Sequence, residues 1–315
     1  MEWRGVGAVF CLLSCAVLAE PAPSVSPAVP VPPGGPVIQI DDVTRFYAVY
    51  DAANGLPTAD QLQSEYLDPG SEGLHHFAKV RRISGTAIAA SLEKNPQLYA
   101  DAKRCMGPLP QVRARLEAAL RRLGELYPEA RFPPVTIAVG RGKPVAVGSP
   151  ANGVQVGLEA LCAANALNPD VEDRFVYVIA HEFVHVQQAS AIIDDEHPTV
   201  LAGALGEGAA EFVAELIAGS VAYSRLAEWA KGREQEFETA FVPEQDRTDL
   251  SRWLYNGEGT REWPGDLGYW IGYRIAKSYY QHSTDKRRAL RDILEMTEPR
   301  ALLARSGWYP GIPLQ

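Results

Sequence analysis

The sequence has 315 residues, 46% of them hydrophobic, and a formal net charge of −9 at pH 7. This acidic balance argues against a nucleic-acid partner, because proteins that bind the phosphate backbone carry an excess of Lys and Arg. The length is enough for one large core or for two lobes around a cleft.

The first residues are typical of a signal peptide, which we place at residues 1–19. A short apolar run from Val6 to Leu18 is too short to span a bilayer stably and has the form of an export signal. No other apolar stretch reaches the length of a transmembrane helix. We therefore expect an exported protein.

Two routes of processing remain open. The stretch Leu12-Leu13-Ser14-Cys15 resembles a bacterial lipobox, with Cys15 as the lipidated residue, whereas ordinary cleavage would fall before Glu20. Residues 20–36 hold seven Pro and no periodic apolar pattern, so we expect an extended tether. A tether after Cys15 favours the lipoprotein, anchored to the membrane by lipid.

Residues 37–315 are expected to form a single unit, beginning with a helical lobe at 37–130. Apolar residues recur at helical spacing in several segments of this lobe. The predicted helices are 42–53, 57–67, 84–94 and 110–127.

Two cysteines, Cys105 and Cys162, lie outside the export segment. In an oxidising envelope we favour a disulfide between them, worth ~4 kcal/mol in the chain-entropy model. Two unpaired buried thiols are the alternative.

A small sheet is expected at the start of the central part, residues 131–220. Val135–Val139 and Val154–Leu158 are short and rich in β-branched residues, and a stretch rich in Gly and Pro separates them. A strand that borders a cleft can align an extended substrate through backbone hydrogen bonds. Gly153–Glu159 is our candidate for this role, and an ordinary structural edge strand is the equal alternative.

The next helix carries the pattern His-Glu-x-x-His at His181, Glu182 and His185. Asn168-Pro169-Asp170 predicts the start of this helix, and no Pro or Gly interrupts residues 171–190. Residues four apart share a helix face, so both imidazoles can hold one zinc ion while the glutamate activates a water. The alternative is a chance occurrence on a buried helix. Metzincins are excluded, because no Gly and third His follow His185.

A further helix at 198–220 is expected to supply the third ligand. Glu207 and Glu211 lie four residues apart among small residues, a like-charge spacing that calls for a cation or a donor. We assign Glu207 to the metal and Glu211 to orienting a ligand histidine through its other ring nitrogen. Glu211 itself and His197 are the rival ligands, and a solvated pair of carboxylates is the alternative.

These motifs carry a resemblance. The pattern of His181, Glu182 and His185, followed by Glu207-Gly208-x-Ala210-x-Phe212, resembles the gluzincin metallopeptidases. More closely, the chain is similar to a bacterial family of predicted zinc-dependent proteases related to gliding-motility lipoproteins. The resemblance implies a zinc-site fold and leaves the substrate undefined. It extends over three further stretches, at Arg45–Asp51, Tyr66–Leu74 and Gly268–Ile275.

The last part, residues 221–315, is predicted to be mostly helical. The expected helices are 223–241, 246–255, 266–281 and 285–296. A hydrolase needs a donor for the oxyanion formed on attack, and Tyr273, then Tyr269, then His282 are our candidates. Tyrosines packed in the core at helical spacing are the alternative.

The sequence thus predicts a mainly α, α+β fold of the zincin type, with a small sheet beside the metal helix. The predicted function is that of an exported zinc metallohydrolase of the bacterial cell envelope, acting on a peptide or protein substrate. In this hypothesis His181, His185 and Glu207 hold Zn²⁺, and Glu182 takes a proton from water and passes it to the leaving amine. The alternative is a non-enzymatic envelope lipoprotein with a structural metal site, acting in assembly or interaction.

Overall fold

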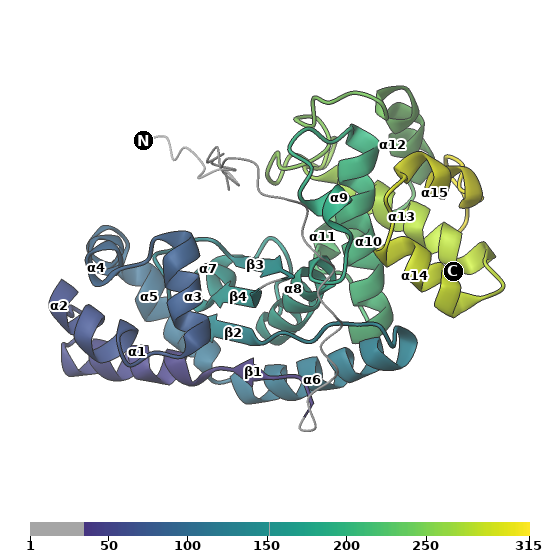
Figure 1. Ribbon diagram of the computed structural model, residues 1–315. Helices are drawn as coiled ribbons and strands as arrows, with labels where there is room; N and C mark the ends of the chain where they lie inside the picture. Colours follow the sequence, from purple (N-terminus) through teal and green to yellow (C-terminus); the bar gives the residue numbers. More distant parts are fainter. Residues whose placement is uncertain (1–34, 151) are drawn as a thin grey trace.

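The computed structural model describes residues 35–150 and 152–315, and Figure 1 shows a mainly helical chain around a small sheet. This agrees with the predicted α+β class. The predicted signal peptide, the lipobox at Cys15 and nearly all of the tether lie outside the described residues. None of the described helices is long and apolar enough to cross a membrane.

The helices of the N-terminal part follow the apolar periodicity closely. The predicted helices at 42–53, 84–94 and 110–127 appear within one residue of their expected ends. The predicted helix at 57–67 begins as a short α-helix and continues as a π-helical segment, Leu62–Leu67. The α-helices are α1 (Asp41–Ala52), α2 (Ala59–Gln61), α3 (Glu72–Arg81), α4 (Gly85–Lys94), α5 (Pro96–Ala102) and α6 (Leu109–Leu126).

A disulfide joins Cys105 to Cys162, as the sequence analysis favoured. Cys105 lies in the 3₁₀ segment Lys103–Met106, and Cys162 in α7 (Leu158–Ala163). The bridge therefore fixes the helical N-terminal part to the segment that leaves the sheet.

The sheet has four strands in the order β1-β2-β4-β3. They are β1 (Ile38–Gln39), β2 (Val135–Ala138), β3 (Ala146–Ser149) and β4 (Gly153–Gly157). Strands β1, β2 and β4 run parallel, whereas β3 is antiparallel to β4, with Val147 opposite Gln155. The stretch rich in Gly and Pro thus contains a strand that the periodicity missed. Because β4 is an interior strand, both predictions for Gly153–Glu159, a strand that aligns a substrate and an ordinary edge strand, are wrong, and β3 is the edge.

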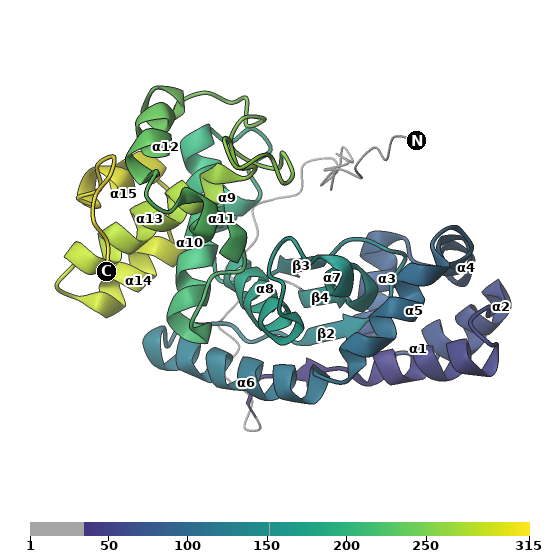
Figure 2. The same cartoon turned by 180° about the vertical axis from the view of Figure 1, so that it is seen from behind.

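Two long helices stand beside that edge. Helix α8 (Val171–His185) contacts β3, and α10 (Val200–Ala218) packs on α8. Their starts are capped as the sequence predicts: the Asp170 carboxylate accepts from the N–H of Asp173, and the Thr199 hydroxyl accepts from that of Ala202. Figures 1 and 2 both show α8 and α10 between the sheet and the C-terminal helices.

A small residue of α10, Gly208, packs against a C-terminal helix. A Cβ atom at Gly208 would lie 2.1 Å from the backbone of Gly272, which belongs to α13 (Leu267–His282). Gly208 and Gly272 therefore allow α10 and α13 to touch backbone to backbone.

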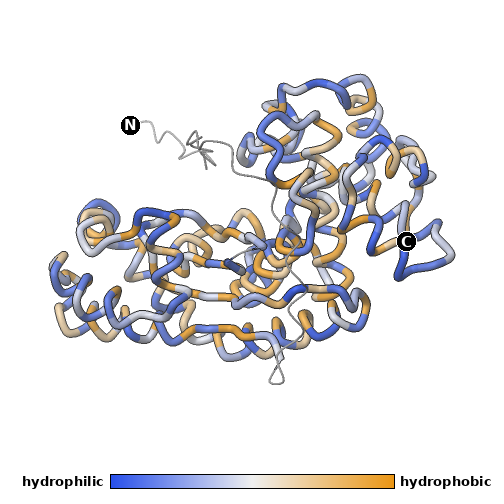
Figure 3. The backbone as a smooth tube through the Cα atoms, viewed as in Figure 1, coloured by the Kyte–Doolittle hydropathy of each residue, from blue (hydrophilic) through white to orange (hydrophobic). Residues whose placement is uncertain are grey.

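The C-terminal part departs from prediction in two places. The expected helix at 223–241 is divided into two near Gly232, which has φ of 80°. Residues 246–255 form turns rather than a helix, and Tyr255 ends them with φ of 56°. The remaining helices are α9 (Ser190–Ile193), α11 (Ser224–Ala230), α12 (Glu234–Phe241), α14 (Lys286–Leu294) and α15 (Pro299–Arg305). Figure 3 shows hydrophobic residues in the interior of this part, where α11, α14 and α15 contact α13.

Candidate metal centre

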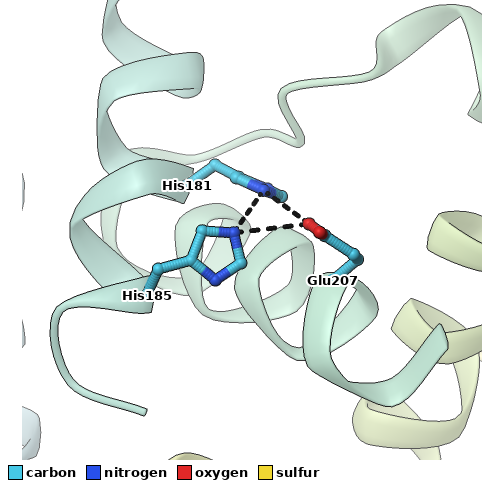
Figure 4. Close-up of side chains that lie close together, drawn as sticks. All are labelled: His181, His185 and Glu207. Carbon is cyan, nitrogen blue, oxygen red and sulfur yellow. Dashed lines mark hydrogen bonds and ion pairs between the residues drawn. The ribbon is translucent and has the colours of Figure 1, made fainter. Parts of the chain in front are cut away.

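Three predicted ligands meet where α8 faces α10 (Figure 4). The Nε2 atoms of His181 and His185 are 3.1 Å apart, and each lies 3.3 Å from Oε2 of Glu207. His181 and His185 are one turn apart on α8, and Glu207 faces them from the middle of α10. The structure therefore brings together the set that the spacing suggested.

The triangle formed by these three donor atoms has the size that a zinc ion requires. Zinc binds imidazole nitrogen and carboxylate oxygen at about 2.0–2.1 Å, so neighbouring donors of a tetrahedral site lie about 3.3–3.4 Å apart. The three distances found here are 3.1, 3.3 and 3.3 Å. Two imidazoles and one carboxylate also form a donor set typical of catalytic zinc. The residues fit this ion in both size and chemistry.

Glu211 contacts the ring nitrogen of His181 that faces away from the cluster. Nδ1 of His181 lies 2.8 Å from Oε1 of Glu211, although the pair forms no aligned hydrogen bond. The other oxygen of Glu211 accepts the N–H of Tyr223. His181 and Glu211 are almost fully buried, at 3% and 2% exposed. An ionised carboxylate beside Nδ1 favours a proton there and leaves Nε2 for the metal.

His185 is oriented by Gln188, a residue that the sequence analysis did not select. Nδ1 of His185 lies 2.6 Å from the amide oxygen of Gln188, whose amide nitrogen donates to the carbonyl of Gly206. Since the amide oxygen can only accept, His185 carries its proton on Nδ1 and presents the lone pair of Nε2. The available signal was a polar residue one turn beyond the second histidine.

Glu207 is bound by Tyr255, the second functional residue that was missed. The Tyr255 hydroxyl donates to Oε1 of Glu207 at 2.7 Å. This contact occupies one carboxylate oxygen and leaves Oε2 directed at the two histidines. No local pattern points to Tyr255, because it lies in a turn far along the chain from Glu207.

The charges of the cluster favour a cation. Burial lowers the pKa of His181, but the carboxylates of Glu211 and Glu207 outweigh it and raise this pKa to about 10. Burial raises the pKa of Glu207, but the two imidazoles hold it well below its usual range. The site therefore attracts positive charge, which a divalent ion would supply.

Glu182 lies beside the triangle, between α8 and the sheet edge. Its Oε2 accepts the N–H of Gly148 in β3 at 2.9 Å. A Cβ atom at position 148 would lie 2.1 Å from the carbonyl oxygen of Glu182, so only glycine lets the strand approach this closely. The side chain of Glu182 is half-buried and takes no part in the three-residue cluster.

Of the other predicted residues, Tyr269 lies at the cluster, whereas Tyr273, His197 and His282 do not. The Tyr273 hydroxyl donates to Glu215 and accepts from Lys277, so the structure does not bring it to the cluster. The Tyr269 ring is buried and stacks on His181, with ring centroids 6.1 Å apart. His197 is exposed, and His282 contacts the carbonyl of Ser278 at the end of α13.

A family model for the gliding motility protein GldB matches residues 38–310. Comparison with curated proteins finds no match, and neither does comparison with solved structures. The matched range contains the sheet, α8, α10 and the whole cluster.

Proposed function

The chain belongs to the family of the gliding motility protein GldB, and on this premise we propose that it is an envelope protein that works through one zinc ion. The family is one of lipoproteins, so the chain is exported to the bacterial cell envelope, as the sequence predicts. The relation to gliding-motility lipoproteins is likewise as expected. The zinc ion and its use are the proposal.

One observation carries the proposal: His181, His185 and Glu207 present three donor atoms at the mutual distances of a tetrahedral zinc site. Glu211, Gln188 and Tyr255 each hold one of these ligands. Polar groups that each hold a ligand in this way around a common point are expected of a metal centre.

The first proposed use is hydrolysis of a peptide bond in a zincin-like site. Zinc in such a site supplies Lewis-acid activation of water and of the carbonyl. In this use Glu182 would hold the proton lost by water and give it to the leaving amine. The edge of β3 could align an extended substrate through backbone hydrogen bonds. Tyr255 replaces Tyr273 as the first candidate for the oxyanion donor, because its hydroxyl lies at Glu207. In this use its single proton, which now goes to Glu207, would turn from that carboxylate to the oxyanion.

The second proposed use is structural, and membership in a gliding-motility family favours it. Zinc would then fix α8 to α10, and through Tyr255 to the turn that precedes α13. An envelope lipoprotein stabilised in this way could act in assembly or interaction without cleaving anything. The two uses need the same ligands and differ in their need for Glu182.

Glu182→Gln separates the two uses. The change preserves shape and the ligand set, so we expect full zinc content and an unchanged melting temperature. Hydrolysis of a broad peptide library should fall by at least the roughly 10²–10⁴-fold supplied by general base catalysis. If the wild type is also inert, and both proteins restore a deletion strain equally well, the hydrolytic use is wrong and the structural use stands.

A further inference from the structure

Two arginines that contact each other, Arg81 and Arg141, have no carboxylate partner in the described part of the chain. Arg81 ends α3, and Arg141 lies in the connection between β2 and β3; neither forms an ion pair with any residue that the structure describes. Nε of Arg141 donates to the carbonyl oxygen of Arg81 at 3.0 Å, which holds the two residues together. Nε of Arg81 is buried and has no hydrogen-bond partner among residues 35–150 and 152–315.

The charges place this pair next to the metal centre. Burial lowers the pKa of the Arg81 guanidinium, the negative charge of Glu182 raises it, and the charge of Arg141 lowers it again. Arg81 thus lies within electrostatic reach of both Glu182 and Arg141. Glu182 thus offsets part of the charge of Arg81 without forming an ion pair with it.

The pair differs from Arg115 in having no carboxylate within ion-pair distance among the described residues. Arg115, which is also partly buried, binds both Glu172 and Asp173. A partly buried guanidinium without an anion loses hydration and gains no hydrogen bonds in return. Its planar fork of N–H groups fits a carboxylate, which can accept two parallel hydrogen bonds.

The strand beside the pair suggests what carries the anion. Among the described strands β3 pairs only with β4, and the N–H of Gly148 points from its outer edge to Glu182. An extended peptide that adds to this edge would run past Glu182 and reach the segment that contains Arg141.

We propose that Arg81 and Arg141 bind a carboxylate of an extended peptide ligand that lies along β3 beside the metal centre. The carboxylate is either the C-terminus of the peptide or an Asp or Glu side chain. The inference rests on the proposed function in taking the ligand to be a peptide, and it needs no cleavage.

The test is peptide binding to the zinc-loaded full chain, measured by fluorescence anisotropy. The probes are a labelled tetra-alanine amide, the same peptide with a free C-terminal carboxylate, and the amide with one Ala replaced by Glu. The wild type should bind at least one carboxylate peptide roughly 10 to 100-fold more tightly than the neutral amide, which is the size of a charge-assisted contact. The preferred probe identifies the source of the carboxylate.

Variants assign the preference to the arginines. Arg81→Met and Arg141→Met should each remove it, whereas Arg81→Lys should keep part of it because the charge remains. Arg82→Met is the matched control, since Arg82 is the next residue, is exposed, and loses the same charge. Zinc content and circular dichroism would verify that each variant is folded.

Equal binding of charged and neutral probes by the wild type would overturn the proposal, and so would a preference that survives in both Met variants. The outcome is independent of hydrolysis. A carboxylate preference without any cleavage would leave the arginine site standing and remove the hydrolytic use. Cleavage without a carboxylate preference would leave the hydrolytic use standing and remove the arginine site.

Discussion

At the residue scale, the proposed zinc ligands depend on the side chains that contact their other polar atoms. An imidazole can bind zinc only through a nitrogen that carries no proton, so the contact at the opposite nitrogen decides which one is available. Glu211 does this for His181 and Gln188 for His185. The two contacts differ in charge, since one is a carboxylate and the other a neutral amide.

Gln188→Leu should weaken zinc binding about 10 to 100-fold, because His185 loses the acceptor that fixes its proton on Nδ1. Glu211→Ala should have an effect of the same size through His181. Competition with a chromophoric chelator would measure both affinities. Gln187→Leu is the control, since Gln187 is also buried but contacts the backbone of Arg131. Equal weakening by Gln187→Leu would show that general destabilisation, and not ring orientation, is responsible.

Asp266 holds the turn that carries Tyr255. Its carboxylate accepts the N–H of Asn256, and its own N–H donates to the side-chain oxygen of Asn256. Burial raises the pKa of Asp266 to about 6. This folded-state pKa lies above the unfolded value of about 3.9, so Asp266 destabilises the fold when it is ionised. Its full contribution to the free energy of unfolding is present below about pH 4, and up to about 3 kcal/mol is lost as the pH rises through about 6.

Asp266→Asn should therefore be more stable than the wild type at pH 8, and the difference should vanish near pH 4. Asparagine keeps an acceptor oxygen and tolerates the positive φ of 61° at this position. Urea unfolding at the two pH values would measure the difference. A variant that is less stable at pH 8 than at pH 4, relative to the wild type, would contradict this account.

At the element scale, α10 is positioned by its crossing with α13. A Cβ atom at Gly272 would lie 1.7 Å from the carbonyl oxygen of Ala204, and this backbone cannot move without moving Glu207 as well. The crossing therefore controls where the third ligand stands relative to α8.

Gly272→Ala should lower the free energy of unfolding by about 1–3 kcal/mol or more, because the helices must separate to admit the methyl group. Gly206→Ala is the matched control within α10, since its nearest neighbour would be a side-chain methyl of Ile192 at 3.2 Å. That change should be neutral or stabilising by up to about 1 kcal/mol, as helix propensity predicts. Chemical denaturation would measure both, and a fully stable Gly272→Ala would refute the crossing as a constraint.

The sequence predicts those elements whose information is local. The starts of α8 and α10 follow from Asp170 and Thr199, and the ligands on them follow from spacing along a helix. Strand β3 was missed because Ala146-Val147-Gly148-Ser149 lacks a run of β-branched residues and is formed by pairing with β4.

Contacts between segments far apart in the chain could not be predicted, because the local sequence carries no pattern for them. Tyr255 reaches Glu207 across 48 positions, and it does so from a turn where periodicity predicted a helix. Tyr273 shares a face of α13 with Tyr269, yet only the packing against α10 places its hydroxyl on Glu215. Spacing identifies candidates on one helix, and it cannot choose among helices that meet in space.

At the scale of the whole molecule, the cluster lies where three parts of the chain meet. Helix α8 contacts the sheet, α10 packs against α13, and Tyr255 belongs to the turn before α13. Figures 1 and 2 show this junction between the sheet and the C-terminal helices. An ion bound here would join both sides, which serves either proposed use.

The most direct test is the zinc content and affinity of the purified protein, measured by elemental analysis and chelator competition. The account predicts about one zinc per chain in the wild type, lost in His181→Ala and His185→Ala, weakened in Glu207→Ala and retained in Glu182→Gln. A wild-type protein that binds no zinc even after reconstitution, or a zinc content unchanged by replacing either histidine, would contradict it.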